Sequence, residues 1–239
     1  RDRLRSRGLG DVYKRQGDMI VIYDFAAAKQ IEADLNKAGY RVTFGNVDKD
    51  AFKTEIAHMY RNGYKKIRFM DGKMEPFVVE REELYPYEEF FKDDYITNPR
   101  LQAAMLNYFQ EFRKQAPLEN RGDILKRREQ IMIDMMLNAE YMVPCVKEET
   151  EEEVEISHHF IDITDRVTEK EEGEHVIAIP VFTDGFEMDK CYEGHYENML
   201  YKFDELVSLM DELGASGIII NCLGISYFMR TALMKKILK

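Results

Sequence analysis

The first part of the chain carries two kinds of hydrophobic pattern. Residues 19–25 (MIVIYDF) form a short apolar, β-branched run, which is typical of a buried strand. Residues 26–38 place apolar side chains four positions apart among Lys, Gln and Glu, which predicts a helix that ends at Gly39. Residues 40–47 then alternate between polar and apolar side chains, so we expect a second strand there.

A second helix and a hairpin are expected next. Asp48 or Asp50 can accept hydrogen bonds from the free N–H groups at the start of a helix. The apolar residues beyond them recur at helical spacing, and Gly63 is expected to end the helix. Residues 66–70 and 75–79 are apolar-rich runs separated by an Asp-Gly pair, which favours a β-hairpin.

From Asn98 onwards the pattern favours longer helices and further strands. Two acidic runs, 148–155 and 169–174, are expected to be solvated hairpin loops. The other expected elements are helices over 99–114, 119–138, 203–213 and 231–238, strands over 141–146, 175–182, 216–221 and 225–228, and an alternating segment over 156–167. This mixture predicts an α/β fold with some α+β character, in which mixed sheets are flanked by helices.

The two ends of this pattern repeat each other. Without a gap, Gly63 falls on Gly214 and the apolar helix faces before these glycines coincide. A two-residue shift in the hairpin then places Arg81 on Arg230, and upstream IVIYDF corresponds to IAIPVFTD. Because helix face, glycine and strand face agree together, the sequence predicts two similar units that arose by internal duplication.

Length and charge narrow the class of protein. The chain has 239 residues, 45% of them hydrophobic, which is enough for two small cores, and its formal net charge is -11. Residues 1–16 are basic and resemble a translated sequencing adapter, so we expect an artefactual tail ahead of units at 17–97 and 98–239. An acidic protein without a long apolar run is not expected to bind nucleic acid or a membrane.

The cysteines and histidines do not form a recognisable reactive motif. Cys145, Cys191 and Cys222 end apolar runs, where a thiol behaves as a small hydrophobe. Their spacing does not match a metal-ligand motif, and their small, odd number favours a reducing cytoplasm. His158 and His159 are adjacent, so on a strand their side chains point to opposite faces. There is also no glycine-rich phosphate loop or serine-nucleophile elbow, so the sequence predicts no catalytic residue, no metal and no cofactor.

Three polar residues end the expected buried strands and are the candidate ligand or partner site. Thr183 and Asp184 follow one strand, and Asn221 ends the next. Thr183 or Asp184 can cap the helix that follows, and Asn221 can fix its turn by bonding its own backbone. The same residues also lie at the carboxyl edge of the sheet, where α/β proteins often bind ligands. Both the structural and the binding interpretation remain open from the residues alone.

Residues 98–239 resemble the SseB family, which is named for enhanced serine sensitivity. The resemblance rests on LNAEYMVPCV, IAIPVFTD, FDELVSLMDELG and GIIINCLG in that order, and residues 17–97 look like a degenerate unit of the same kind. The family commonly has proline after the asparagine where this chain has Cys222, and YDF in the first unit has no counterpart of the threonine in FTD. The resemblance implies a cytoplasmic bacterial accessory or interaction module without an established reaction, and it supplies no catalytic residues.

These observations lead to two functional hypotheses. The first is a noncatalytic binding or regulatory protein of the SseB-like type, in which the acidic hairpin controls which protein partners approach. The alternative is a small-molecule-binding protein or an enzyme, with an amino-acid-related metabolite bound near Thr183, Asp184 and Asn221. The ligand class of this alternative comes only from the name of the family that the chain resembles.

Overall fold

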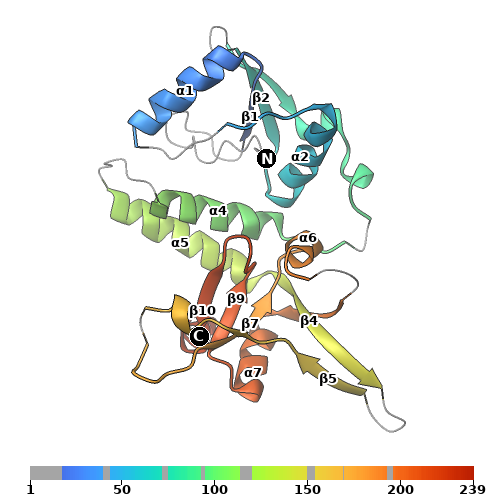
Figure 1. Ribbon diagram of the computed structural model, residues 1–239, viewed down its shortest axis with the longest axis vertical. Coiled ribbons are helices and arrows are strands. Elements are labelled where there is room, and N and C mark those ends of the chain that lie inside the picture. Colours follow the sequence, from blue (N-terminus) through green and yellow to red (C-terminus); the bar gives the residue numbers. More distant parts are fainter. Residues whose placement is uncertain are drawn as a thin grey trace. The chain divides into compact units, whose positions relative to one another are not determined.

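The computed structural model describes residues 18–39, 44–71, 75–92, 95–113, 120–149, 154–168, 170–192 and 196–239, so residues 1–16 lie outside the described part of the chain. The chain forms two compact units (Figure 1). Unit 1 takes its described residues from Arg1–Asp94 and Pro99–Met132, and unit 2 takes its own from Tyr95–Asn98 and Ile133–Lys239. Helices together with mixed or antiparallel sheets make up the described part of both units, which confirms the expected α/β fold class.

Within its described residues, unit 1 has a mixed sheet of three strands in the order β1-β2-β3. β1 (Asp18–Ile22) is parallel to β2 (Lys66–Met70), and β2 is antiparallel to β3 (Phe77–Glu80). Between β1 and β2 the chain passes through α1 (Phe25–Lys37) and α2 (Lys49–Arg61). The Asp48 side chain accepts a hydrogen bond from Ala51 N, which confirms it as the cap of α2.

The core of unit 1 lies between α2 and the sheet. Its buried members are Met19, Ile56, Met59, Tyr60 and Ile67. Aromatic residues from the connection after α3 (Arg81–Leu84), which includes the short helix η1 (Tyr87–Glu89), pack against this core. Burial of these apolar side chains is the main stabilising contribution to the unit.

The helices α4 (Pro99–Arg113) and α5 (Arg121–Leu137) follow, and the division between the units differs here from the expected boundary at residue 98. α4 groups with unit 1 because it packs on α2. A Cβ atom built at Gly63 would lie 2.6 Å from Pro99 O, so the end of α2 closely approaches the start of α4. α5 contributes residues to both units.

The described part of unit 2 has two sheets, which are joined by an isolated bridge. In the first sheet, β10 (Tyr227–Arg230), β9 (Gly217–Ile220), β7 (Ile177–Val181) and β6 (Ile161–Asp162) are neighbours in that order. The second sheet has the order β5-β4-β8, formed by β5 (Val154–His158), β4 (Glu140–Glu149) and β8 (Glu197–Lys202). Met142 and Phe182 exchange two backbone hydrogen bonds of 2.9 Å, which join β4 to the end of the β7 segment.

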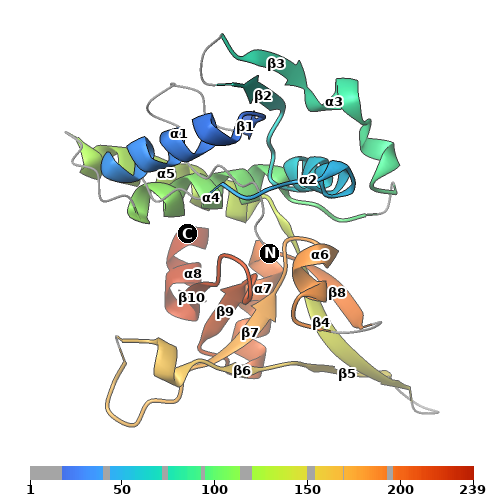
Figure 2. The ribbon, with the colours of Figure 1, turned by 45° about the horizontal axis from the view of Figure 1, so that its top comes forward.

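The helices of unit 2 complete its cores. α7 (Phe203–Leu213) and α8 (Thr231–Leu238) pack against each other, and α8 also contacts β9 and β10 (Figure 2). The short helices η2 (Thr164–Arg166) and α6 (Gly185–Asp189) lie in the connections that flank β7. A separate buried cluster joins Ile163, Val176, Ala178, Phe182, Met188, Ile219 and Cys222.

The two units share one order of elements. In unit 1, β1 is parallel to β2, β2 is antiparallel to β3, and α3 follows. In unit 2, β7 is parallel to β9, β9 is antiparallel to β10, and α8 follows. Gly63 (φ 72°) and Gly214 (φ 63°) both follow the central helix with positive φ. The shared order is an observation, whereas duplication as its origin stays a prediction.

The hydrogen bonds correct the sequence alignment of the two hairpins by one residue. Arg81 N donates to Lys65 O, and Thr231 N donates to Ser216 O in the corresponding place. Arg81 therefore corresponds to Thr231, and the expected match with Arg230 is wrong. The reason is the length of the segment between the paired strands. The last pair is Phe69 with Phe77 in unit 1 and Ile220 with Tyr227 in unit 2, so the segment is one residue shorter in unit 2.

Two other expectations about elements need correction, and the structure adds a strand that was not expected. Residues 44–47 are not a strand, and residues 40–43 of that expected strand lie outside the described part. The acidic run 148–155 is not simply a loop, because cross-strand pairing continues to Glu149 in β4 and starts again at Val154 in β5. β8 was not expected, because its residues do not alternate cleanly between buried and exposed side chains.

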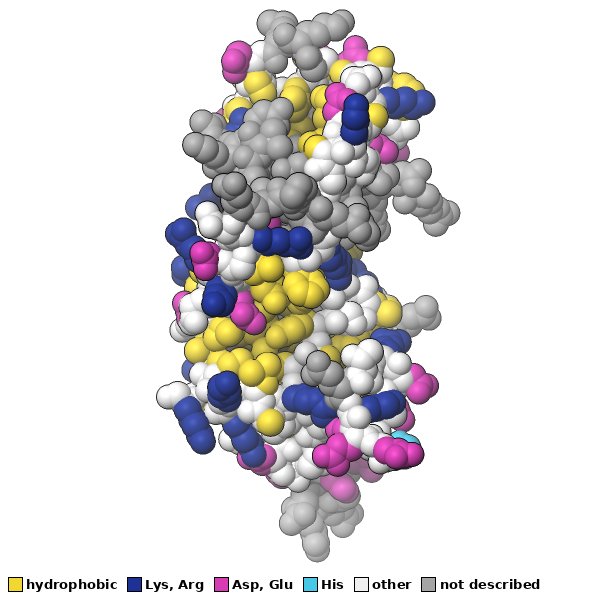
Figure 3. All heavy atoms as spheres, turned by 90° about the vertical axis from the view of Figure 1, so that its left-hand side faces the viewer, with side chains coloured by type: hydrophobic (Ala, Val, Ile, Leu, Met, Phe, Trp, Pro, Cys, Tyr) yellow, Lys and Arg dark blue, Asp and Glu magenta, His cyan; other side chains and the backbone are white. Residues whose placement is uncertain are grey.

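Among the described residues, no helix is long and apolar enough to cross a membrane. Some large hydrophobic side chains nevertheless remain at the surface. On the face drawn in Figure 3, hydrophobic side chains gather near lysine and arginine side chains.

Candidate functional site

The structure brings Thr183 and Asn221 into direct contact. β7 and β9 are parallel, so both residues follow their strands at the same edge of the sheet. Asn221 Nδ2 donates to Thr183 Oγ1 at 2.9 Å, and Thr183 N donates to Asn221 Oδ1 at 3.1 Å. The two residues therefore lie together at the carboxyl edge of the sheet, as expected, and the Asn221 amide bonds both the hydroxyl and the backbone N–H of Thr183.

Asp184 caps the short helix α6. Its carboxylate accepts a hydrogen bond of 2.9 Å from Glu187 N, three residues later, as an N-cap side chain does. In unit 1, Asp24 accepts a hydrogen bond of 2.8 Å from Ala27 N at the start of α1. The same aspartate cap thus follows the first parallel strand of both units, and Tyr23 precedes it where unit 2 has Thr183.

Asn221 also begins the turn that leads to β10. Its φ of 51° lies in the left-handed region, which asparagine tolerates better than most residues. Its carbonyl oxygen accepts hydrogen bonds from Gly224 N at 2.7 Å and Ser226 N at 3.0 Å. The expected role in fixing the turn is thus performed by the backbone, while the side chain contacts Thr183.

These three side chains are closed off from solvent. Thr183 and Asp184 are 0% exposed and Asn221 is 1% exposed. Each has hydrogen-bond partners within the protein, as buried polar groups require. The arrangement supports their structural interpretation, because a ligand would have to displace these contacts to reach them.

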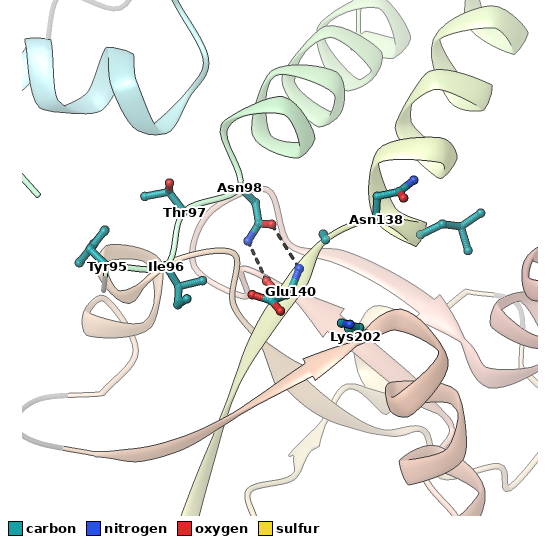
Figure 4. A pocket seen from close by; sticks show the side chains of 9 residues that line it. Tyr95, Ile96, Thr97, Asn98, Asn138, Glu140 and Lys202 are labelled. Atoms are coloured by element: carbon teal, nitrogen blue, oxygen red, sulfur yellow. Dashed lines mark hydrogen bonds between the residues drawn. The ribbon is translucent and has the colours of Figure 1, made fainter. Parts of the chain in front are cut away.

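A pocket of about 550 Å³ lies nearby within unit 2, and none of these three residues lines it. Figure 4 shows the residues around it, which come from the segment before α4, the end of α5, the start of β4 and the end of β8. They are Tyr95, Ile96, Thr97, Asn98, Leu137, Asn138, Ala139, Glu140 and Lys202. Most of the labelled side chains are polar, so the pocket suits a small polar ligand.

Asn98 connects this pocket to the buried polar residues. Its Nδ2 donates to Glu140 O at 2.7 Å and its Oδ1 accepts from Glu140 N at 3.3 Å (Figure 4). The same Nδ2 also donates to Thr183 O at 2.7 Å. The amide therefore fixes residues 95–98 against both β4 and the end of the β7 segment. Sequence analysis missed this role, although an asparagine directly before a helix-starting proline was a visible signal.

Opposite charges face each other at the wall of the pocket. Glu140 and Lys202 are directly opposite in the antiparallel pairing of β4 and β8, and both are exposed. Directly opposite residues lie on the same face of a sheet, about 5 Å apart at their Cβ atoms. A carboxylate and an ammonium group are thus available side by side to a ligand that carries both charges.

The β4–β5 hairpin presents a different surface. Figure 1 shows β4 and β5 leaving the rest of unit 2 as a two-stranded hairpin. Glu148 is directly opposite Glu155, and Val146 is opposite Ser157 on the same face. Val146 is 42% exposed, and both glutamates are exposed as well. The hairpin therefore combines two carboxylates with an uncovered apolar side chain.

The adjacent histidines contact different partners, although only His158 belongs to β5 and His159 lies just beyond its end. His158 Nε2 lies 3.3 Å from Tyr201 OH, and desolvation by burial lowers the pKa of His158. The His159 ring instead packs edge-on against Tyr192 and Tyr196. No group of three or more His, Cys, Asp or Glu side chains within the described residues is placed to hold a metal ion.

Two cysteines that are far apart in the sequence meet in unit 2. Cys191 Sγ lies 2.8 Å from Cys222 Sγ, and both residues are free thiols. Burial, together with the hydrogen bond between the two thiols, raises the pKa of Cys222 to about 12. The sequence analysis treated these cysteines only as small hydrophobes. It did not predict their contact, because the two residues are far apart in the sequence.

Comparison of the chain with protein-family models, curated proteins and solved structures finds no significant match. The resemblance to the SseB family therefore stays a prediction that rests on the motifs of residues 98–239.

Proposed function

We propose that this protein is a noncatalytic cytoplasmic binding protein of the SseB-like type, which binds a basic segment of a partner protein on its β4–β5 hairpin. The observation that carries the proposal is the cross-strand pair of Glu148 and Glu155. Like charges directly opposite each other destabilise an antiparallel pair. Lysine or arginine side chains of a partner would relieve this repulsion.

Two further features support a basic protein partner. Val146 shares the face of the two glutamates and is 42% exposed, so it offers an apolar contact beside the charges. The formal net charge of -11 attracts a basic segment from a distance and repels nucleic acid and anionic lipid. Such binding needs no reacting group, which agrees with the structural use of Thr183, Asp184 and Asn221.

A labelled decalysine peptide provides a defined test of this proposal. Its affinity is measured by fluorescence anisotropy at several salt concentrations, for the wild type and for the variant Glu148→Gln/Glu155→Gln. We expect the variant to bind roughly tenfold more weakly and with less salt dependence, because each exposed ion pair contributes up to about 1 kcal/mol.

A matched control separates the hairpin from general acidity. The variant Glu171→Gln/Glu172→Gln removes the same charge from two exposed residues of the other acidic run. We expect it to bind the peptide nearly as well as the wild type. Equal losses of affinity in the two variants would show that only the net charge matters, which would contradict a site on the hairpin. Unchanged affinity of the hairpin variant would refute the proposal.

The pocket favours a second candidate function, which is the binding of a small zwitterionic metabolite such as an amino acid. The observation behind it is the opposite charge of Glu140 and Lys202 at one wall of the pocket. The ligand ammonium group would face Glu140, its carboxylate would face Lys202, and Asn138 would supply a further hydrogen-bonding group.

A thermal-shift screen of the common amino acids tests this candidate. We expect a saturable rise in melting temperature with some of them, which Lys202→Gln abolishes and the control Lys147→Gln retains. Lys147 is an exposed lysine of β4 that does not line the pocket. The absence of any saturable shift, or equal shifts in both variants, would contradict the zwitterion site.

A further inference from the structure

The contact between Cys191 and Cys222 joins two segments that enclose the carboxyl edge of the first sheet of unit 2. Cys191 lies just after α6, and its backbone N donates to Met188 O at 2.9 Å. Cys222 directly follows Asn221 in the turn after β9. The two residues are 31 positions apart in the chain, so only the tertiary fold brings their sulfur atoms to 2.8 Å.

The surroundings leave one cysteine residue partly exposed and bury the other. Cys191 is partly exposed, whereas Cys222 is 9% exposed and belongs to the buried cluster around Phe182. The turn also approaches α6 at a second place, since a side chain at Gly224 would collide with the Glu187 carboxylate. The two segments are therefore already held against each other before any bond forms between the sulfur atoms.

We propose that Cys191 and Cys222 are a reversible oxidation site, at which a small disulfide such as oxidised glutathione converts the two thiols into an intramolecular disulfide. A disulfide has a sulfur–sulfur length of about 2.05 Å, so the two sulfur atoms must approach by less than about 1 Å. The site is separate from the β4–β5 hairpin and stands whether or not that surface binds a partner.

The reaction is a two-step exchange of thiol and disulfide. The Cys191 thiolate attacks one sulfur of the small disulfide, which forms a mixed disulfide and releases the first small thiolate. Cys222 then gives up its proton to solvent and attacks Cys191 Sγ, which releases the second. Overall the two cysteines lose two electrons and two protons, and the small disulfide is reduced to two thiols. The accessible thiol reacts first because burial raises the pKa of Cys222.

The new bond would tie α6 to the turn that begins at Asn221. Both segments contain buried groups of the polar site, namely Asp184 at the start of α6 and Asn221 at the start of the turn. Closing the chain between residues 191 and 222 also restricts the unfolded state. We therefore expect the oxidised protein to melt roughly 5 to 10 °C above the reduced protein.

The test treats the folded full chain with oxidised glutathione, blocks the remaining thiols and maps the cysteines by mass spectrometry without reduction. We expect a cross-linked peptide pair containing Cys191 and Cys222, which dithiothreitol reverses together with the rise in melting temperature. The variants Cys191→Ser and Cys222→Ser should each abolish both signals. Cys145→Ser is the matched control and should retain both, because Cys145 is a buried residue of β4 paired with His158.

Each contrary result has a defined meaning. Recovery of both thiols in blocked form after prolonged treatment of the folded wild type would overturn the proposal, provided that the unfolded chain does form disulfides. A cross-link that requires Cys145, or that joins two chains, would also overturn it. If one serine variant fails to fold, the wild type and Cys145→Ser still decide the matter, because the cross-linked peptides are identified directly.

Discussion

The side-chain amide of Asn221 makes two hydrogen bonds with Thr183: it donates to Thr183 Oγ1 and accepts from the Thr183 backbone N–H. Both residues are buried, and they are 38 positions apart in the chain. The contact closes the edge of the sheet at which α/β proteins often bind ligands. In this protein that edge is occupied by the protein's own polar groups, and the open pocket lies beside it.

Removing the Asn221 amide should destabilise unit 2. Asn221→Ala leaves the buried Thr183 N–H without its acceptor and puts alanine at φ 51°, so we expect a loss of about 2 to 3 kcal/mol in the free energy of unfolding. Asn221→Gly removes the same amide but tolerates the φ angle, and should cost about 1 kcal/mol less. Urea denaturation measures both, and an alanine variant within 0.5 kcal/mol of the wild type would contradict this role.

The two aspartate caps should differ in their contribution to stability. Asp184 is fully buried and Asp24 is partly exposed, so we expect Asp184→Ala to cost about 2 kcal/mol and Asp24→Ala about 1 kcal/mol. The matched substitutions to asparagine keep an accepting oxygen and should cost less at each position. Chemical denaturation gives the four values. A cost for Asp24→Ala that exceeds the cost for Asp184→Ala would show that burial does not set the order.

The two glycines after the central helices separate conformational strain from steric conflict. Both have positive φ, but a Cβ at Gly214 meets nothing within 4 Å, whereas a Cβ at Gly63 lies 2.6 Å from Pro99 O. We expect Gly214→Ala to cost about 1 kcal/mol and Gly63→Ala to cost more, because a backbone oxygen cannot move aside easily. Thermal and urea unfolding test the difference. Similar costs at both positions would argue against the close approach of α2 and α4.

His158 should make the stability of the protein depend on pH. Burial lowers its pKa in the folded state below 6.5, so the unfolded chain binds the proton more tightly. Its contribution is therefore present above pH 6.5 and is lost in the window that begins near this pH and extends below it. We expect His158→Gln to lose less melting temperature over this window than the wild type. The control His159→Gln should follow the wild type, and an identical pH profile for all three proteins would refute the prediction.

Local patterns in the sequence determined the elements whose stability comes from nearby residues. The apolar spacing in 203–213 predicted α7 with the bounds that the structure has, and Asp48 was one of two candidate caps because a cap acts within one helical turn. The apolar runs at 175–182 and 216–221 predicted the buried strands β7 and β9, which the structure pairs in parallel. The parallel pairing of these strands made the proximity of Thr183 and Asn221 predictable as well.

Only the tertiary structure decided what these residues contact. The hydrogen bond between the Thr183 and Asn221 side chains depends on the register of β7 and β9. The hydrogen bond from Asn98 to Thr183 joins residues that are 85 positions apart in the chain. The cysteine pair and the Glu140–Lys202 pair likewise arise from connections that the hydrophobic pattern does not encode. Sequence periodicity reports which face of an element is buried, whereas the packing of distant elements decides which side chain lies across from it.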